Sequence, residues 1–318
     1  MNSAKNSIST VLKNNQTWSL SILGSAFILC ALMALAVFSA NTAYASDHST
    51  LHKSNNARIV AIDGSISEIV FALGKGDLMV GRDTTTTYPE AASKLPSVGY
   101  MRMLSAEGIL SLKPTLVLAT KDAKPQNVLT RLKDAGVHIE IIDNEYTPKG
   151  VELKIRQIAK ILKVEAKGEQ LAQKVYQSVK NAQLIVQKAL HQNKTEPASA
   201  LFILNMRGNN MMVAGKGSRA DIMMQLAGIT NPATEHFHGY KPLTAEAAIQ
   251  FNPDYLLTME HGIEAAGGKE AILNTPAVKM TNAGQNKNLI LVDDNFLMFG
   301  PRIGEAIEMM VHTIYKSK

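Results

Sequence analysis

The chain has 318 residues, of which 46% are hydrophobic, 19% charged and 5% aromatic. This composition excludes disordered, collagenous and multi-span membrane proteins, and the length fits one or two domains. The formal net charge of +6 is too small to favour a nucleic-acid partner.

The first 45 residues have the pattern of a secretory signal peptide. A basic, Ser/Asn-rich start leads into an uncharged apolar run over about residues 18–38, followed by Ala43-Tyr44-Ala45. Small residues in this A-x-A spacing form a signal-peptidase site. An uncleaved membrane anchor is the alternative, because the run is nearly long enough to span a bilayer. We therefore predict export to the periplasm and removal of residues 1–45.

Cys30 is the single cysteine, and it lies inside the apolar run. The bulky Leu29 before it and the apolar residues after it argue against lipid attachment. A mature chain without thiols suits an oxidising compartment, and it excludes disulfide scaffolds and cysteine-based zinc sites.

Two segments repeat in the same order, which predicts two similar lobes. Residues 60–74 match residues 213–228 at an offset of 153, and residues 104–119 match residues 243–258 at an offset of 139. The difference between the offsets places 14 extra residues in the first lobe, around residues 82–96. A loop-rich insertion after a strand is a common place for ligand contacts.

Strands alternate with helices in each repeat. Apolar and β-branched runs predict strands at 58–62, 116–119, 137–142 and 200–204, and residues 127–135 predict a helix. Ser65 with Glu68, and Ser218 with Asp221, have the spacing of helix capping boxes. The alternation predicts a parallel sheet in each lobe.

A long helix is predicted between the lobes. Residues 151–192 contain almost no turn signal except near Gly168, and the part from 165 to 192 has a length on the order of 40 Å as a helix. This predicts a first lobe at 46–164, a connecting helix at 165–194 and a second lobe at 195–318. An ordinary surface helix is the alternative. The apolar positions that repeat at the helical period are Leu171, Val175, Val179, Ala182, Val186 and Ala189.

Five segments carry a resemblance to a known family: residues 59–74, 87–89, 98–102, 104–107 and 239–244. The chain resembles the periplasmic haem-binding proteins of haem ABC importers, within the class that also carries cobalamin and ferric siderophores. The resemblance implies the class III periplasmic binding protein architecture, an α/β fold with two similar lobes and parallel-type sheets joined by one long helix. It also implies capture of ferric haem in a cleft between the lobes.

In that family a tyrosine of the first lobe is the axial ligand of the haem iron, and Tyr88 is the matching position. A phenolate is a hard donor that suits Fe(III), and tyrosine ligation of haem is known. A half-exposed Tyr-Pro turn is the alternative interpretation of Tyr88. Cations would assist coordination, and Arg82 and Arg102 are the candidates.

The rest of the predicted haem site should offer apolar surface to the macrocycle and positive charge to its propionates. These candidates are Tyr100, Met101, Met206, Arg207, Tyr240 and Lys241. Some relatives carry a haem-contacting histidine after the strand at 200–204. This chain has none there, so a second histidine ligand and a stacked haem pair are not expected.

Glu107 and Glu246 occupy equivalent positions in the repeated S/T-A-E segments. The resemblance implies that one glutamate of each lobe docks onto arginines of the ABC permease. Helix-dipole complementarity is the alternative explanation for an acidic residue near a helix start. An outer-membrane haem receptor is a further expected partner upstream.

Other functions have little support in the sequence. The chain lacks the common hydrolase, metalloprotease and redox motifs, so we expect no enzyme. His236, His238 and His261 could serve a bare transition metal, but these candidates all fall in one lobe. A carrier of a ferric siderophore, cobalamin or a bare metal ion is therefore the alternative to a haem carrier.

Overall fold

The computed structural model describes residues 57–193, 196–208 and 210–315. The predicted signal peptide lies outside the described residues. Within the described part of the chain, the helices are too short or too polar to cross a membrane.

The first half of the fold is built on a four-stranded sheet with the order β2-β1-β3-β4. All neighbouring strands are parallel, as the sequence predicts for this lobe. Strands β1 and β3 are buried along their whole length, which is typical of strands covered on both faces. The strands are β1 (Ile59–Ile62), β2 (Met79–Arg82), β3 (Leu116–Thr120) and β4 (His138–Ile142).

Helices connect these parallel strands, because a parallel pair needs a crossover. They are α2 (Gly64–Ala72), the 3-10 helix η1 (Gly76–Leu78), α3 (Glu90–Ser93), α4 (Ala106–Leu110), α5 (Gln126–Asp134) and α6 (Pro148–Ile161). The predicted helix at 127–135 therefore corresponds to α5.

The second half contains a mixed five-stranded sheet with the order β7-β6-β5-β8-β9. The prediction of a parallel sheet is correct only for β5, β8 and β9. Strand β6 runs antiparallel to β5, because the short connection between them allows a hairpin and no crossover. Strand β7 pairs antiparallel with β6. The strands are β5 (Ala200–Arg207), β6 (Asn210–Ala214), β7 (Tyr240–Leu243), β8 (Tyr255–Met259) and β9 (Leu289–Val292).

Short helices surround this second sheet. They are α8 (Arg219–Leu226), η2 (Pro232–Glu235), α9 (Ala245–Phe251), α10 (Glu260–Ala265), α11 (Lys269–Leu273), α12 (Pro276–Lys279), α13 (Asn282–Gln285) and η3 (Asp294–Leu297). The last helix, α14 (Ile303–Tyr315), returns toward the long helix.

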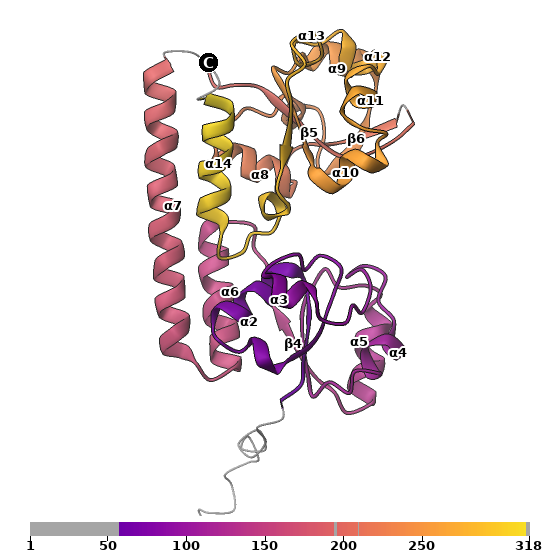
Figure 1. Ribbon diagram of the computed structural model, residues 1–318, viewed down its shortest axis with the longest axis vertical. Coiled ribbons are helices and arrows are strands. Elements are labelled where there is room, and N and C mark those ends of the chain that lie inside the picture. The colour runs from indigo at the N-terminus through magenta and orange to yellow at the C-terminus, as the bar shows by residue number, and fades with distance from the viewer. Residues whose placement is uncertain (1–56, 194–195, 209, 316–318) are drawn as a thin grey trace, which may run out of the picture. The chain divides into compact units, whose positions relative to one another are not determined.

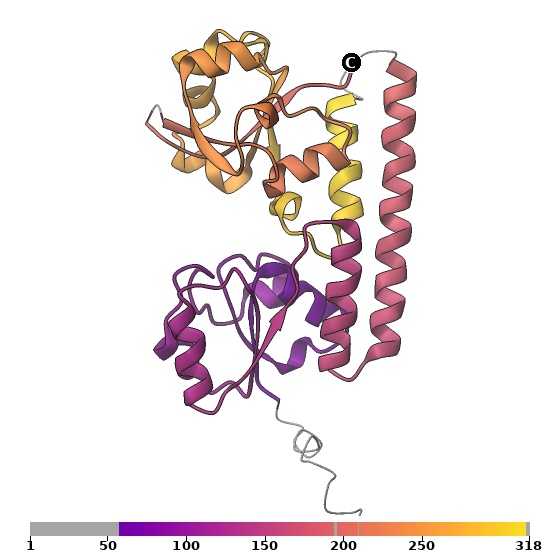
Figure 2. The same ribbon diagram turned by 180° about the vertical axis from the view of Figure 1, so that it is seen from behind.

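The long helix α7 (Glu165–Asn193) packs against α6 of the first half and α14 of the second half. Both views show it running alongside these two helices (Figure 1, Figure 2). The prediction of one long helix joining two α/β lobes is thus confirmed. One hydrophobic core includes Ile59 of β1, Val179 of α7 and Phe202 of β5, so the halves share apolar packing.

The predicted apolar stripe of α7 faces this core. Val175, Val179, Ala182 and Val186 are buried, and Leu171 and Ala189 pack against the same cluster. The 3.6-residue period was therefore sufficient to identify the buried face.

Helix α7 begins at Glu165, as predicted, and the break before it lies at residues 162–164, ahead of the turn signal at Gly168. Lys163 adopts a left-handed conformation there, with φ of 55°. Gly168 lies inside α7, where a Cβ atom would collide with the side chain of Ala159 on α6. Its role is close packing of α6 on α7, and a glycine with that role gives the same sequence signal as a chain break.

Of the two predicted capping boxes, the one at Ser218 is confirmed as an N-cap. The Asp221 carboxylate, however, accepts from the Gly217 backbone N–H, and the Ser218 N–H donates to the Gly215 oxygen. Ser218 caps α8 and accepts a hydrogen bond from the Asp221 backbone N–H at 3.2 Å. For α2 the N-cap is Asp63, whose side chain accepts from the Ser65 backbone N–H at 2.9 Å. Glu68 is thereby left for a tertiary contact, described below.

Candidate functional site

The carboxyl ends of the first parallel sheet bring a set of polar side chains to one edge. Asp63 follows β1, Asp83 follows β2 and Asp122 follows β3. Ligands commonly bind outside this edge of an open α/β sheet. The edge therefore marks where a site in the first half is expected.

Asp83 holds the inserted loop against the turn after β1. Its carboxylate accepts from the Thr85 hydroxyl at 2.9 Å and from the Asp63 backbone N–H at 3.2 Å. Thr85 in turn accepts from the Gly64 backbone N–H at 2.8 Å. The start of the loop that carries Tyr88 is thus fixed to the sheet.

Burial raises the pKa of Asp83 to about 6, and the nearby Asp63 carboxylate adds to the increase. The folded chain therefore binds this proton more tightly than the unfolded chain. The stability from this group is present below about pH 4 and is lost as the pH rises through about 6.

We expect D83N to remove this pH dependence, because the amide keeps an oxygen for Asp63 and Thr85 but does not titrate. Urea unfolding of the wild type and D83N should show a difference in free energy that changes by about 1 to 3 kcal/mol between about pH 4 and about pH 7. The exposed Asp77 gives a matched control, D77N. Parallel pH profiles for wild type and D83N would contradict this role of Asp83.

Tyr88 lies in the insertion and is 48% exposed. The guanidinium carbon of Arg302 lies 3.8 Å from the centre of its ring. Arg302 also donates from Nε to Glu68 Oε1 at 3.0 Å and from Nη2 to Oε2 at 3.4 Å. Arg302 precedes α14, so a cation of the second half contacts the tyrosine predicted as iron ligand.

Arg82, predicted as a helper cation for Tyr88, contacts backbone carbonyl groups. Its Nη2 donates to the Ser93 oxygen at 2.8 Å and its Nη1 to the Asp83 oxygen at 3.2 Å. These bonds tie the two ends of the insertion together. The cation on the face of the Tyr88 ring is therefore Arg302.

The predicted segment at 98–102 lies next to the insertion. The Thr84 backbone N–H donates to the Gly99 oxygen at 3.0 Å, and the Val98 N–H donates to the Arg82 oxygen at 2.8 Å. Tyr100 is 43% exposed and Arg102 is exposed. The segments that carry Tyr88 and Tyr100 are thus joined by backbone hydrogen bonds.

Tyr240 of the second half is mostly buried, and burial raises its pKa. The positive charges of Arg219 and Arg102 have the opposite effect and lower the pKa of this phenol. Because Arg102 belongs to the first half, this places predicted residues of both halves within electrostatic range of each other. Lys241 is exposed, with its ammonium 5.8 Å from the centre of the Phe237 ring.

The remaining predicted contacts differ in their surroundings. Met101 and Met206 are buried in the hydrophobic cores of the first and second halves, at 3% and 5% exposure. Packing in the protein core is sufficient to explain the positions of both methionine side chains. Arg207 is exposed at the end of β5.

Arg219 and Tyr146 form a contact between the halves that the sequence did not predict. Arg219 begins α8, and its Nη2 donates to the Tyr146 hydroxyl at 2.7 Å. Its guanidinium carbon lies 4.4 Å from the ring centre of Tyr146, and its Nη2 lies 3.7 Å from Asp122 and 3.9 Å from Asp63. Burial raises the pKa of Tyr146 to about 12, so its hydroxyl keeps its proton and donates to Asp122 at 2.6 Å.

Lys154 adds a further contact that was not predicted. It is fully buried, and its ammonium donates to the Ser65 hydroxyl at 2.9 Å and to the Phe299 carbonyl oxygen at 3.2 Å. Burial lowers its pKa to about 8.

A sequence signal existed for both arginines. Arg219 occupies the first position of α8 and Arg302 directly precedes α14. A cation at a helix N-terminus is opposed by the helix dipole, so such a residue is expected to have a compensating partner elsewhere.

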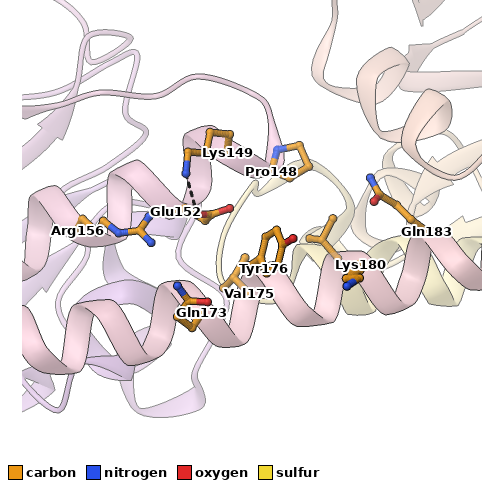
Figure 3. A pocket seen from close by; sticks show the side chains of 10 residues that line it. Pro148, Lys149, Glu152, Arg156, Gln173, Val175, Tyr176, Lys180 and Gln183 are labelled. Carbon is orange, nitrogen blue, oxygen red and sulfur yellow. Dashed lines mark hydrogen bonds and ion pairs between the residues drawn. The ribbon is translucent and has the colours of Figure 1, made fainter.

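The structure also contains two larger pockets. One of about 670 Å³ lies along α6 and α7, and Figure 3 shows Lys149, Glu152 and Tyr176 among its lining side chains. Another of about 620 Å³ lies beside the carboxyl ends of β3 and β4 and is lined by Lys121, Asn144 and neighbours. The predicted haem residues line neither pocket.

Glu107 and Glu246 have equivalent surroundings in the two halves. Each lies in the first turn of its helix, α4 or α9, and each is exposed. Ser105 and Thr244 are the respective N-caps. The repeat in the sequence thus corresponds to a repeated local structure that presents a carboxylate to solvent.

The histidines considered as ligands for a bare metal ion include His236. His236 packs against Phe251, with ring centres 4.8 Å apart. Among the residues that the structure describes, no three His, Cys, Asp or Glu side chains come together as a metal site.

Comparison with known proteins gives a consistent picture. The family model described as "Periplasmic binding protein" matches residues 59–296. The structure of the "Periplasmic heme-binding protein BhuT in complex with two hemes" is 37% identical to this chain, covers 82% of it and 98% of BhuT, and superposes with a TM-score of 0.77. A Bacillus subtilis protein described as "Uncharacterized ABC transporter substrate-binding lipoprotein YvrC" is 29% identical over 85% of this chain and 84% of its own length.

A third relative is the haem-binding protein HmuT, 27% identical, with a TM-score of 0.75 and 82% of each chain covered. Two of its structures carry alanine in place of a tyrosine and of an arginine two positions later.

Proposed function

The chain belongs to the periplasmic binding protein family, and on that basis we propose that it captures ferric haem between its two halves and delivers it to an ABC permease. The observation that carries the proposal is the combination of fold and chemistry. A chain that superposes on a haem-bound relative over 98% of that relative also presents two exposed tyrosines near the carboxyl edge of its first sheet, and Arg302 lies over the ring of one of them, Tyr88. We propose no reaction on the ligand.

The iron ligand in this proposal is a phenolate of the first half. Tyr88 is the residue predicted from the sequence, and its ring is held by Arg302. Tyr100 is the second candidate, because it is 43% exposed and lies on the segment that backbone hydrogen bonds join to the insertion. Each phenol is about half exposed and accessible to an incoming ligand.

The charges near the site support binding of a ligand with carboxylates. Arg102 and Lys241 are exposed and come from opposite halves. Arginine in particular binds carboxylates through two parallel hydrogen bonds. We propose that these side chains, with Arg207 at the end of β5, contact the haem propionates.

Location and partners follow from the same proposal. An extracytoplasmic protein with the predicted signal peptide would receive haem that an outer-membrane receptor has passed inward, and Glu107 and Glu246 would dock onto the permease. The exposure of both carboxylates supports this.

Titration of the purified protein with hemin tests the function. We expect a saturating change in the haem absorption spectrum, with a band typical of phenolate ligation, and an endpoint that distinguishes one bound haem from the two in BhuT. Cobalamin, a ferric siderophore and Zn²⁺ are titrated in parallel by calorimetry. Saturable binding of one of these, with no spectral change from hemin, would replace the haem proposal by the alternative carrier.

A further inference from the structure

Two clusters that each combine an arginine, a tyrosine and at least one carboxylate join the halves. The Arg302 cluster consists of Arg302, Tyr88 and Glu68, and the Arg219 cluster consists of Arg219, Tyr146, Asp122 and Asp63. In each, a guanidinium from the second half lies over a tyrosine ring of the first half, at 3.8 Å and 4.4 Å from the ring centre. In each, the same guanidinium is within 4 Å of a first-half carboxylate.

Both guanidinium groups are mostly removed from solvent. The Arg302 side chain is 22% exposed and the Arg219 side chain 18%, against 5% for Glu68 and 3% for Asp63. A charge in such surroundings requires its partners, because removing one of them leaves an uncompensated buried charge. Separation of the halves at these points would therefore be strongly unfavourable unless water replaced every contact.

The two clusters are attached to different parts of the first half. The Arg302 cluster uses α2 and the inserted loop, through Glu68 and Tyr88. The Arg219 cluster uses the segments after β1, β3 and β4. Two points of attachment restrict both the distance and the tilt between the two halves. A single point would leave the tilt free.

Close backbone contacts reinforce the Arg302 cluster. A Cβ atom on Gly300 would lie 3.3 Å from Glu68 Oε2 and 3.6 Å from the Ser65 Cβ. The segment before α14 therefore lies directly on α2, and Lys154 bonds its Phe299 carbonyl from the first half.

We propose that Arg219 and Arg302 are positioning residues, which together fix the separation of the two halves and thereby the width of the space in which a ligand is held. The planar guanidinium is important for this role, because it stacks on a ring and bonds a carboxylate at the same time, whereas lysine is a point charge on a flexible stem. The part that concerns the ligand rests on the proposed function, but the part that concerns the separation of the halves does not.

The test measures the distance between the halves and ligand release in the same variants. Spin labels at K133C on α5 and K279C on α12, in a C30S background, report the distance distribution of the ligand-free protein; both positions are exposed. The variants are R219Q/R302Q, R219K/R302K and the charge-matched surface control K188Q/K180Q. Hemin release is followed by transfer to a haem-scavenging globin.

We expect R219Q/R302Q to broaden the distance distribution and to accelerate hemin release by at least about 10-fold. R219K/R302K should give an intermediate broadening, because it keeps the charges and loses the planar stacking. The surface control should match the wild type. If R219Q/R302Q does not fold, as judged by circular dichroism, the distance distribution and hemin release of R219K/R302K decide the test.

An unchanged distance distribution in the folded variants would overturn the proposal. A broadened distribution with unchanged hemin release would overturn the claim that the arginines set the ligand space. Failure of the wild type to bind hemin would refute the proposed function separately, and the distance measurement would still decide whether the arginines hold the halves.

Discussion

Replacing both Tyr88 and Tyr100 with phenylalanine is expected to abolish the phenolate band of the ferric haem complex. The substitution removes one oxygen from each ring and leaves the apolar surface and the Arg302 stacking in place. Hemin affinity should fall by at least about 100-fold, equivalent to about 2.8 kcal/mol, because the iron–oxygen bond is lost while macrocycle burial remains. Absorption and resonance Raman spectra with a hemin titration provide the measurement.

The two single variants identify the ligand. Y88F should reproduce the double variant if Tyr88 is the ligand, as the sequence-based assignment predicts, and Y100F should do so if Tyr100 is the ligand. Y176F on α7, an exposed tyrosine far along the sequence from both, is the matched control and should bind hemin as the wild type does. Retention of the phenolate band in Y88F/Y100F would exclude both residues.

Reversing both docking carboxylates is expected to abolish haem uptake while leaving haem binding intact. Glu107 and Glu246 are exposed and lie in short helices that begin at a Ser or Thr cap, so arginine can be accommodated without loss of packing. Two attractive contacts with permease arginines would become repulsive in E107R/E246R. Growth on haem as iron source and haem uptake into proteoliposomes with the permease are the readouts.

The control for this experiment carries the same change in net charge. D134R/E264R reverses one exposed acidic residue in each half, on α5 and α10. It should support uptake at the wild-type rate. Normal uptake by E107R/E246R would show that these glutamates do not dock, and loss of uptake in both variants would point to net charge instead.

The sequence was sufficient for the elements whose signal is local. The period of apolar residues identified the buried face of α7, and the S/T-A-E repeat placed Glu107 and Glu246 near helix starts. The strand runs corresponding to β1, β3 and β4 were placed to within a residue of their starts. These features depend on residues close together in the chain.

The features that the sequence missed depend on residues far apart. Arg302 and Glu68 are 234 positions apart and Arg219 and Tyr146 are 73 apart, so no local pattern relates them. Glu68 was assigned to a capping box because its spacing from Ser65 fits one, whereas the fold pairs it with Arg302. Gly168 was interpreted as a turn signal, because close helix packing and a turn both favour glycine.

The shared apolar core has a consequence for how the chain folds. One part of α7 packs against α6 and another part packs against α14. Residues of both sheets belong to the same apolar cluster. Each half has a core of its own beside its sheet, but the shared cluster is complete only when both halves are present. Each half synthesised alone would therefore expose apolar surface. Melting of the residues from 57 to 315 should accordingly be a single cooperative event, and a nascent chain that has emerged only to the end of α7 would need protection from aggregation until α14 arrives.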